Sequence, residues 1–97
     1  MPRPKRPRHI RFNPNVKYFK PRGVPMRRLE EVILASDEVE ALRLYNLKDL
    51  SQTEAAQQMK ISQPTFARTI NNTYKKIARA LIEGYAIRLE PPQTHLE

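Results

Sequence analysis

The most regular pattern of apolar and polar positions in this chain lies between residues 51 and 81. In its second half, apolar side chains follow one another at steps of three and four residues. They are Phe66, Ile70, Tyr74, Ile77 and Leu81. This spacing predicts a helix with one apolar stripe, and the polar residues between these positions predict an exposed opposite face.

Two N-capping patterns divide this segment into two helices. Ser51 with Glu54 fits a capping box, in which each side chain accepts a hydrogen bond from a backbone N–H of the first turn. Ser62 can cap the second helix, with Pro64 in its first turn, where a missing N–H costs nothing. Gly84 is placed to end that helix in the left-handed conformation. We therefore expect a helix-turn-helix with a long second helix, its helices over about 52–59 and 63–83.

Shorter patterns precede the helix-turn-helix. Val32–Leu34 is a brief apolar run that predicts a buried strand. Asp37 with Glu40 fits another capping box and predicts a helix over about 38–46. The expected buried line of this helix is Val39, Leu42 and Tyr45 or Asn46, with Ala41 and Leu44 flanking it and with Leu47 and Leu50 closing the core.

Two further segments predict strands. Ala86–Leu89 alternates loosely, and its nearest apolar partner is Val32–Leu34, so we expect these two to pair, within one subunit or across a dimer. Near the N-terminus, Ile10 and Phe12 could pair with Val16 and Tyr18 in a hairpin. An irregular loop held by its aromatic residues is the alternative there.

Together these elements predict a mainly α fold, a helix-turn-helix with a long second helix, a small N-terminal β element and a short C-terminal strand. The expected organisation is a flexible basic arm at 1–8, a single domain at 9–90 and a tail at 91–97.

Composition adds an anionic partner to this picture. The 97 residues carry a net charge of +8 and a pI of about 10.2. The excess is uneven, since residues 1–28 hold ten Lys and Arg and no acidic residue. Such a balance favours an anionic partner through long-range attraction.

Composition also excludes several classes. The chain has no cysteine, which excludes disulfides and thiolate metal sites. No apolar run approaches the roughly 18 residues of a membrane span, so we expect a cytoplasmic protein without a membrane partner. There are only two glycines, and His9 and His95 lie near the ends. We expect no enzyme activity, no catalytic residue, no metal and no cofactor.

The outer face of the second helix carries the functional expectation. At about 100° per residue, its polar side chains point away from the apolar stripe. A helix of this kind suits the major groove, with its early residues at base edges and its later cations near phosphates. An ordinary amphipathic surface helix is the simpler alternative. The expected base-reading residues are Gln63, Thr65, Arg68, Thr69 and Asn72, and the expected phosphate-contacting residues are Ser51, Gln52, Ser62, Lys75, Lys76 and Arg79.

The first eight residues alternate proline with cations and cannot bury apolar area. Such an arm could follow phosphates or lie in a minor groove. It could equally be a solubilising tail. Its cations are Arg3, Lys5, Arg6 and Arg8.

Several runs of the sequence resemble a known family. The runs are YFKPRG, DEVEALRL, LSQTEAAQQM, ISQPTFARTI and KIARALIEGYAIRLE, and the likeness covers roughly residues 2–90. The family is domain of unknown function 134, small prokaryotic proteins usually described as predicted DNA-binding proteins. The helix-turn-helix alone is also similar to region four of bacterial sigma factors, which reads promoter DNA with the matching helix.

The resemblance implies a sequence-specific DNA binder and a transcriptional regulator. Two positions depart from the family. Relatives usually have Gly where Lys60 stands, so Lys costs about 1 kcal/mol if that site needs a positive φ. Relatives often begin the reading helix with Arg where this chain has Gln63, and Gln suits adenine better than guanine. Many relatives also have cysteine near the N-terminal hairpin, and this chain has none.

Three functions follow as expectations. The first is a homodimeric regulator on double-stranded DNA, with half-sites about one helical turn apart. The second is RNA or ribosome binding through the basic, aromatic-containing N-terminal third. The third is an interaction module that docks on RNA polymerase or another regulator.

Overall fold

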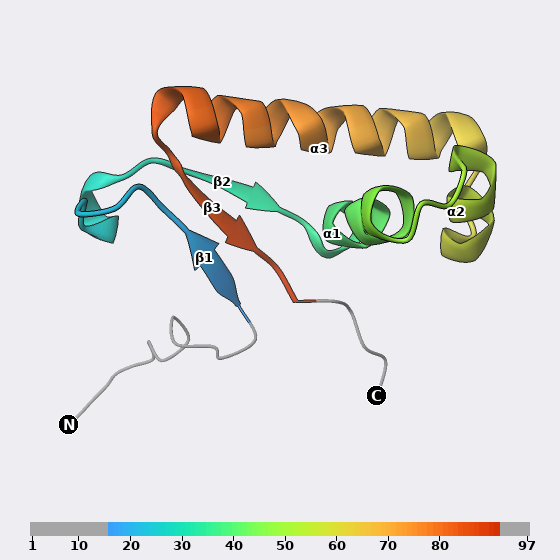
Figure 1. Ribbon diagram of the computed structural model, residues 1–97, viewed down its shortest axis with the longest axis horizontal. Coiled ribbons are helices and arrows are strands. Elements are labelled where there is room, and N and C mark those ends of the chain that lie inside the picture. Colours follow the sequence, from blue (N-terminus) through green and yellow to red (C-terminus); the bar gives the residue numbers. More distant parts are fainter. Residues whose placement is uncertain (1–15, 92–97) are drawn as a thin grey trace.

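The computed structural model describes residues 16–91, and Figure 1 shows how their elements are arranged. A long helix, α3 (Gln63–Glu83), runs along one side of the molecule. It passes over a small sheet at its C-terminal end and over the other helices at its N-terminal end. The remaining elements are β1 (Lys17–Phe19), β2 (Glu31–Leu34), α1 (Ser36–Leu42), α2 (Gln52–Met59) and β3 (Ala86–Leu89), with a 3₁₀ turn at Met26–Arg28 and a π-helical segment at Arg43–Leu47.

The three strands form one sheet in the order β1-β3-β2. β3 lies in the middle, parallel to β2 and antiparallel to β1, with Val32 opposite Ile87 and Tyr18 opposite Arg88. The predicted pairing of Val32–Leu34 with Ala86–Leu89 is therefore confirmed, and it occurs within one chain. The first strand of the predicted N-terminal hairpin, with Ile10 and Phe12, lies outside the described residues, as do the basic arm and residues 92–97 of the tail.

The helix-turn-helix begins and ends as its caps predict. Ser51 Oγ accepts a hydrogen bond from Glu54 N at 3.0 Å, and Glu54 Oε1 accepts one from Ser51 N at 2.9 Å. Ser62 Oγ accepts a hydrogen bond from Thr65 N at 3.2 Å, which caps α3. Gly84, in the left-handed conformation at φ 77°, ends it. Chemistry within one helical turn fixes these boundaries.

The core under the helix-turn-helix contains small residues at the helix crossing. Ala55 and Ala56 are buried on α2, against Phe66 of α3 and Leu44 of the π-helical segment. The ring of Tyr45 meets that of Phe66 edge to face, with centroids 6.0 Å apart. Alanines let the backbones approach closely enough for one aromatic ring to fill the centre.

The first helix differs from its prediction in start, end and buried face. It begins at Ser36 rather than near Glu38, because the carboxylate of Glu38, not that of Glu40, caps the first turn. Glu38 Oε1 accepts a hydrogen bond from Ala35 N at 2.9 Å. After Leu42 the backbone widens, and Lys48 N donates to Arg43 O at 2.9 Å.

The face that packs into the core is shifted by one residue from the predicted line, to Glu38, Ala41 and Leu44. Ala41 and Leu44, expected to flank, are fully buried. Val39, Leu42 and Tyr45 are half-buried, Asn46 is exposed, and Leu47, expected to close the core, is 77% exposed. Leu50 packs against the core as expected.

The buried stripe of α3 also differs from its prediction in the second half of the helix. Phe66 and Ile70 are buried and Ile77 is half-buried, but Thr73 and Ala80 are buried in place of Tyr74 and Leu81. Steps of four drift by about 40° each, and a step of three corrects the drift. Positions 66, 70, 73, 77 and 80 alternate the two steps and stay within one narrow face, with Thr73 Oγ1 donating to Thr69 O at 2.7 Å.

Among residues 16–91, no helix combines the length and the apolar character that crossing a bilayer requires.

Candidate nucleic-acid interface

The candidate interface is built on the first half of α3. Phe66 and Ile70 fix one side of the helix in the core, so the opposite side faces outward. The cap by Ser62 and the proline at position 64 fix where the helix starts. The position of every outward side chain then follows from its place in the sequence, which is how a helix presents a defined set of groups to a partner.

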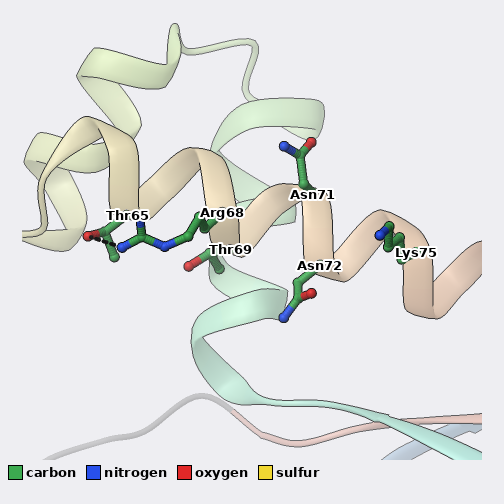
Figure 2. Close-up of a pocket in the computed structure, with 6 residues that line it drawn as sticks. All are labelled: Thr65, Arg68, Thr69, Asn71, Asn72 and Lys75. Carbon is green, nitrogen blue, oxygen red and sulfur yellow. Dashed lines mark hydrogen bonds between the residues drawn. The ribbon is translucent and has the colours of Figure 1, made fainter.

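A shallow, open groove of about 450 Å³ lies along this outer side (Figure 2). Arg68 extends back along the helix toward Thr65, with Nη2 at 3.4 Å from Thr65 Oγ1. Asn71 and Asn72 leave the helix on different sides. The residues that line the groove are Thr65, Arg68, Thr69, Asn71, Asn72 and Lys75.

Four of the five predicted base-reading residues line this groove, and so does Lys75 from the predicted phosphate set. Asn71 was missing from the predicted set, although its angle of about 240° from Thr65 places it on the outer side. Hydroxyl and amide groups can donate and accept hydrogen bonds, the guanidinium of Arg68 donates them, and no carboxylate lines the groove. Such a surface suits a polyanion that also presents hydrogen-bond donors and acceptors.

Gln63, the fifth predicted base-reading residue, lies at the first position of α3. Its Nε2 donates a hydrogen bond of 2.6 Å to Oε1 of Gln52, the first residue of α2. The two helix N-termini therefore meet through their side chains, beside the groove. Ser51 and Ser62, both predicted to contact phosphate, are the caps of these two helices.

Lys76 differs from the other residues of the predicted phosphate-contacting set, because its ammonium is already paired within the fold. Its ammonium lies 2.7 Å from Glu38 Oε1 and 2.8 Å from the carbonyl oxygen of Ile33. Glu38 is buried, so Lys76 neutralises a carboxylate inside the fold. We therefore leave Lys76 out of the interface.

Lys75 and Arg79 continue the cationic surface toward the sheet. They line a second open groove of about 390 Å³ between α3 and β2, together with Asn72 and Glu31. The guanidinium of Arg79 lies 6.0 Å from the centroid of the Tyr85 ring, within the range of a cation–π contact. This second groove has an acidic member, Glu31, whereas the groove around Arg68 has none.

The potential metal ligands of residues 16–91 lie apart from one another. No three or more His, Cys, Asp and Glu of residues 16–91 come close enough together to hold a metal ion. On α1, the hydrogen bond from Arg43 lowers the pKa of the Glu40 carboxyl. It pairs with Arg43 at 2.7 Å, away from the groove.

The fold and the groove define a small, mainly α protein with a helix-turn-helix arrangement and one polar, cationic helix face. The chain belongs to the family described as "Protein of unknown function DUF134", whose model matches residues 1–94.

Relatives confirm that the likeness spans the domain. A UPF0251 protein of Thermoanaerobacter pseudethanolicus is 54% identical over 90 residues, which cover 93% of this chain and 76% of the relative. A UPF0251 protein of Dehalococcoides mccartyi is 50% identical over 90 residues, which cover 93% of this chain and 77% of the relative. No solved structure matches the chain at a significant level.

Proposed function

We propose that this protein binds double-stranded DNA in a sequence-specific manner and regulates transcription in the cytoplasm. The observation that carries the proposal is the groove on α3. It lies on the outward side of the second helix of a helix-turn-helix, directly after the capped N-terminus. A second helix of this kind enters a major groove with its first turns against base edges.

The side chains of the groove match that task in type and order. Thr65, Arg68 and Thr69 come first along the helix, and Arg is the residue that most often reads guanine through O6 and N7. Asn72 follows one turn later, and Asn pairs with adenine through N6 and N7. Lys75 and Arg79 lie farther along, where a cation reaches phosphates and fixes the register.

The experiment is selection of bound duplexes from a random DNA pool at near-physiological salt, with the full-length protein. We expect enrichment of a short motif, repeated as two inverted half-sites about one helical turn, roughly 34–36 Å, apart. An unenriched pool overturns the proposal. Binding to the selected duplex should also weaken steeply with salt, because phosphate contacts release counterions.

Arg68→Ala tests the assignment of the groove. We expect it to reduce discrimination at one base pair by about 1–3 kcal/mol. Arg27→Ala is the matched control, since it removes the same charge from the exposed 3₁₀ turn, remote from α2 (Figure 1). If Arg68→Ala weakens all sequences equally, as a lost charge alone would, Arg68 is not a base-reading residue.

RNA binding is the second candidate, and one observation favours it. Tyr18 and Phe19 on β1 are 42% and 59% exposed, between the exposed Lys17 and Lys20. Exposed aromatic rings between cations are typical of surfaces on which single-stranded bases stack. Competition between the selected duplex and structured RNA separates the two, and Phe19→Ala should weaken RNA binding.

Docking on RNA polymerase or another regulator would use the same helix-turn-helix without reading DNA. Its affinity should depend little on salt, which distinguishes it from phosphate binding.

A further inference from the structure

A hydrogen bond between Gln63 and Gln52 determines which hydrogen-bonding groups Gln63 presents to a partner. A glutamine amide offers one carbonyl oxygen and two N–H donors, and rotation of the amide by half a turn exchanges them. Here Gln63 Nε2 donates to Gln52 Oε1 at 2.6 Å. That bond uses one N–H of Gln63 and leaves its carbonyl oxygen and one N–H free.

Both glutamines stand on fixed backbone. Gln52 is the first residue of α2, next to Ser51, whose N–H and hydroxyl both bond with Glu54. Gln63 is the first residue of α3, next to Ser62, which accepts a hydrogen bond from Thr65 N. Gln52 is half-buried and Gln63 is exposed, so Gln52 is the more restrained partner of the two.

We propose that Gln52 is a positioning residue that orients the amide of Gln63 to read adenine in the major groove. Adenine presents an acceptor, N7, beside a donor, N6–H, and one carbonyl oxygen with one N–H matches that pair in a bidentate contact. Gln52, which uses its oxygen for Gln63, keeps two N–H donors for a phosphate. This inference rests on the proposed DNA binding. It specifies adenine as the base that Gln63 reads and Gln52 as the residue that orients Gln63.

The entropy that Gln63 would lose on binding DNA supports a positioning role for Gln52. A long, exposed side chain loses rotamer freedom when it binds, and a partner that holds it beforehand removes part of that loss. Removal of Gln52 should therefore weaken the reading of one base more than it weakens attachment to the backbone. A residue that only contacts phosphate would change binding to all sequences alike.

The test uses the duplex selected by the wild-type protein and derivatives with each base pair replaced in turn. Gln63→Ala identifies the position that Gln63 reads. We expect an A·T pair there, with discrimination of roughly 5- to 150-fold over other pairs in the wild-type protein. Gln52→Ala should remove most of that discrimination and leave it intact at other positions, and in a Gln63→Ala background it should change discrimination no further.

Gln52→Glu separates the two roles of Gln52. A carboxylate still accepts a hydrogen bond from Gln63, but it repels phosphate, so we expect discrimination to survive while binding to every sequence weakens. Gln57→Ala is the matched control, an exposed glutamine on α2 about 140° around the helix from Gln52. It should retain both affinity and discrimination, and thermal unfolding of each variant checks that it is folded.

Three results would overturn the inference. Gln52→Ala could lower binding to all sequences equally, Gln52→Glu could lose discrimination as fully as Gln52→Ala, or the position read by Gln63 could prefer a pair other than A·T. An unenriched wild-type pool is a distinct outcome, since it removes the proposed DNA binding itself and this inference with it.

Discussion

At the scale of single residues, the turn between α2 and α3 departs from ordinary backbone geometry, at one of two non-glycine residues with a positive φ among residues 16–91. Lys60 ends α2 in the left-handed conformation, at φ 61° and ψ 42°. A side chain with a Cβ atom is strained there, and glycine is not. The turn holds this conformation because Lys60 N donates to Gln57 O and Ile61 N donates to Ala56 O.

Lys60→Gly should therefore stabilise the protein by about 1 kcal/mol. Lys60→Ala is the control, because it removes the same charge and keeps the Cβ atom, so it should give no such gain. Urea unfolding of the three proteins measures the difference. Equal stability of the two variants would show that the turn holds no strain at position 60.

A second residue-scale prediction concerns pH. The hydrogen bond from Arg43, opposed in part by desolvation, holds the pKa of Glu40 below its usual 4.5. A lowered folded-state pKa contributes stability above the unfolded value, and that contribution disappears as the pH falls through the folded value. Both side chains are more than a third exposed, so the contribution is no more than about 0.5 kcal/mol.

Glu40→Gln should accordingly be slightly less stable than the wild-type protein at pH 7. The two should converge in stability as the pH falls through the lowered folded-state pKa of Glu40, because the wild-type carboxyl is then protonated. Thermal unfolding over this pH range gives the comparison. A difference that stays constant down to pH 2 would assign the effect to something other than this ion pair.

Side-chain contacts between residues close in sequence could be predicted, whereas contacts between residues far apart in sequence could not. The caps at Ser51 and Ser62 depend on partners three residues away, so the local sequence specifies them. The pair of Glu38 with Lys76 joins residues 38 positions apart. Nothing in the local sequence distinguishes Lys76 from Lys75 beside it on a basic helix, because only the packing of α1 against α3 brings Glu38 to Lys76.

At the scale of elements, α3 shows why the outer side was predicted better than the inner one. Tyr74 and Leu81 are more hydrophobic than Thr73 and Ala80, and the predicted buried stripe therefore included Tyr74 and Leu81. In the structure Thr73 and Ala80 are buried, and small side chains let helices and sheets approach closely. The outer side around Arg68 lies opposite both the predicted and the observed buried stripe. Its prediction therefore did not depend on which of the two is buried.

The cap of α3 gives the element-scale prediction. Ser62→Ala should cost about 1 kcal/mol of stability, because Thr65 N loses its partner at the helix start. Ser62→Asp keeps an oxygen there and should restore the stability, while its negative charge beside the groove should weaken DNA binding. Chemical unfolding and duplex binding of both variants are the measurements. An aspartate variant as unstable as the alanine variant would contradict the capping role.

At the scale of the whole molecule, the polar groove and two strongly exposed apolar side chains lie at different ends of α3. Leu81 and Ile82 are 73% and 84% exposed near the C-terminal end of the helix, next to a groove that Phe19 and Tyr85 also line. The helix rises about 1.5 Å per residue, so Leu81 lies roughly 20 Å along it from Arg68. Two copies that meet at this apolar end would hold two reading faces no more than roughly 40 Å apart, a span that includes the 34–36 Å of one DNA turn.

We therefore predict that the apolar end joins two copies, and that this contact sets the spacing of the half-sites. The double variant Leu81→Gln, Ile82→Gln should sediment as a monomer and should bind a single half-site about as well as the wild-type protein, while it loses the advantage of the paired site.

Leu47→Gln is the matched control, since it removes another largely exposed leucine, at the helical end of the molecule. A wild-type protein that sediments as a monomer at its DNA-binding concentration would contradict the prediction, and so would a double variant that remains a dimer. Loss of the dimer together with unchanged binding to the paired site would show that the copies associate without setting the spacing on DNA.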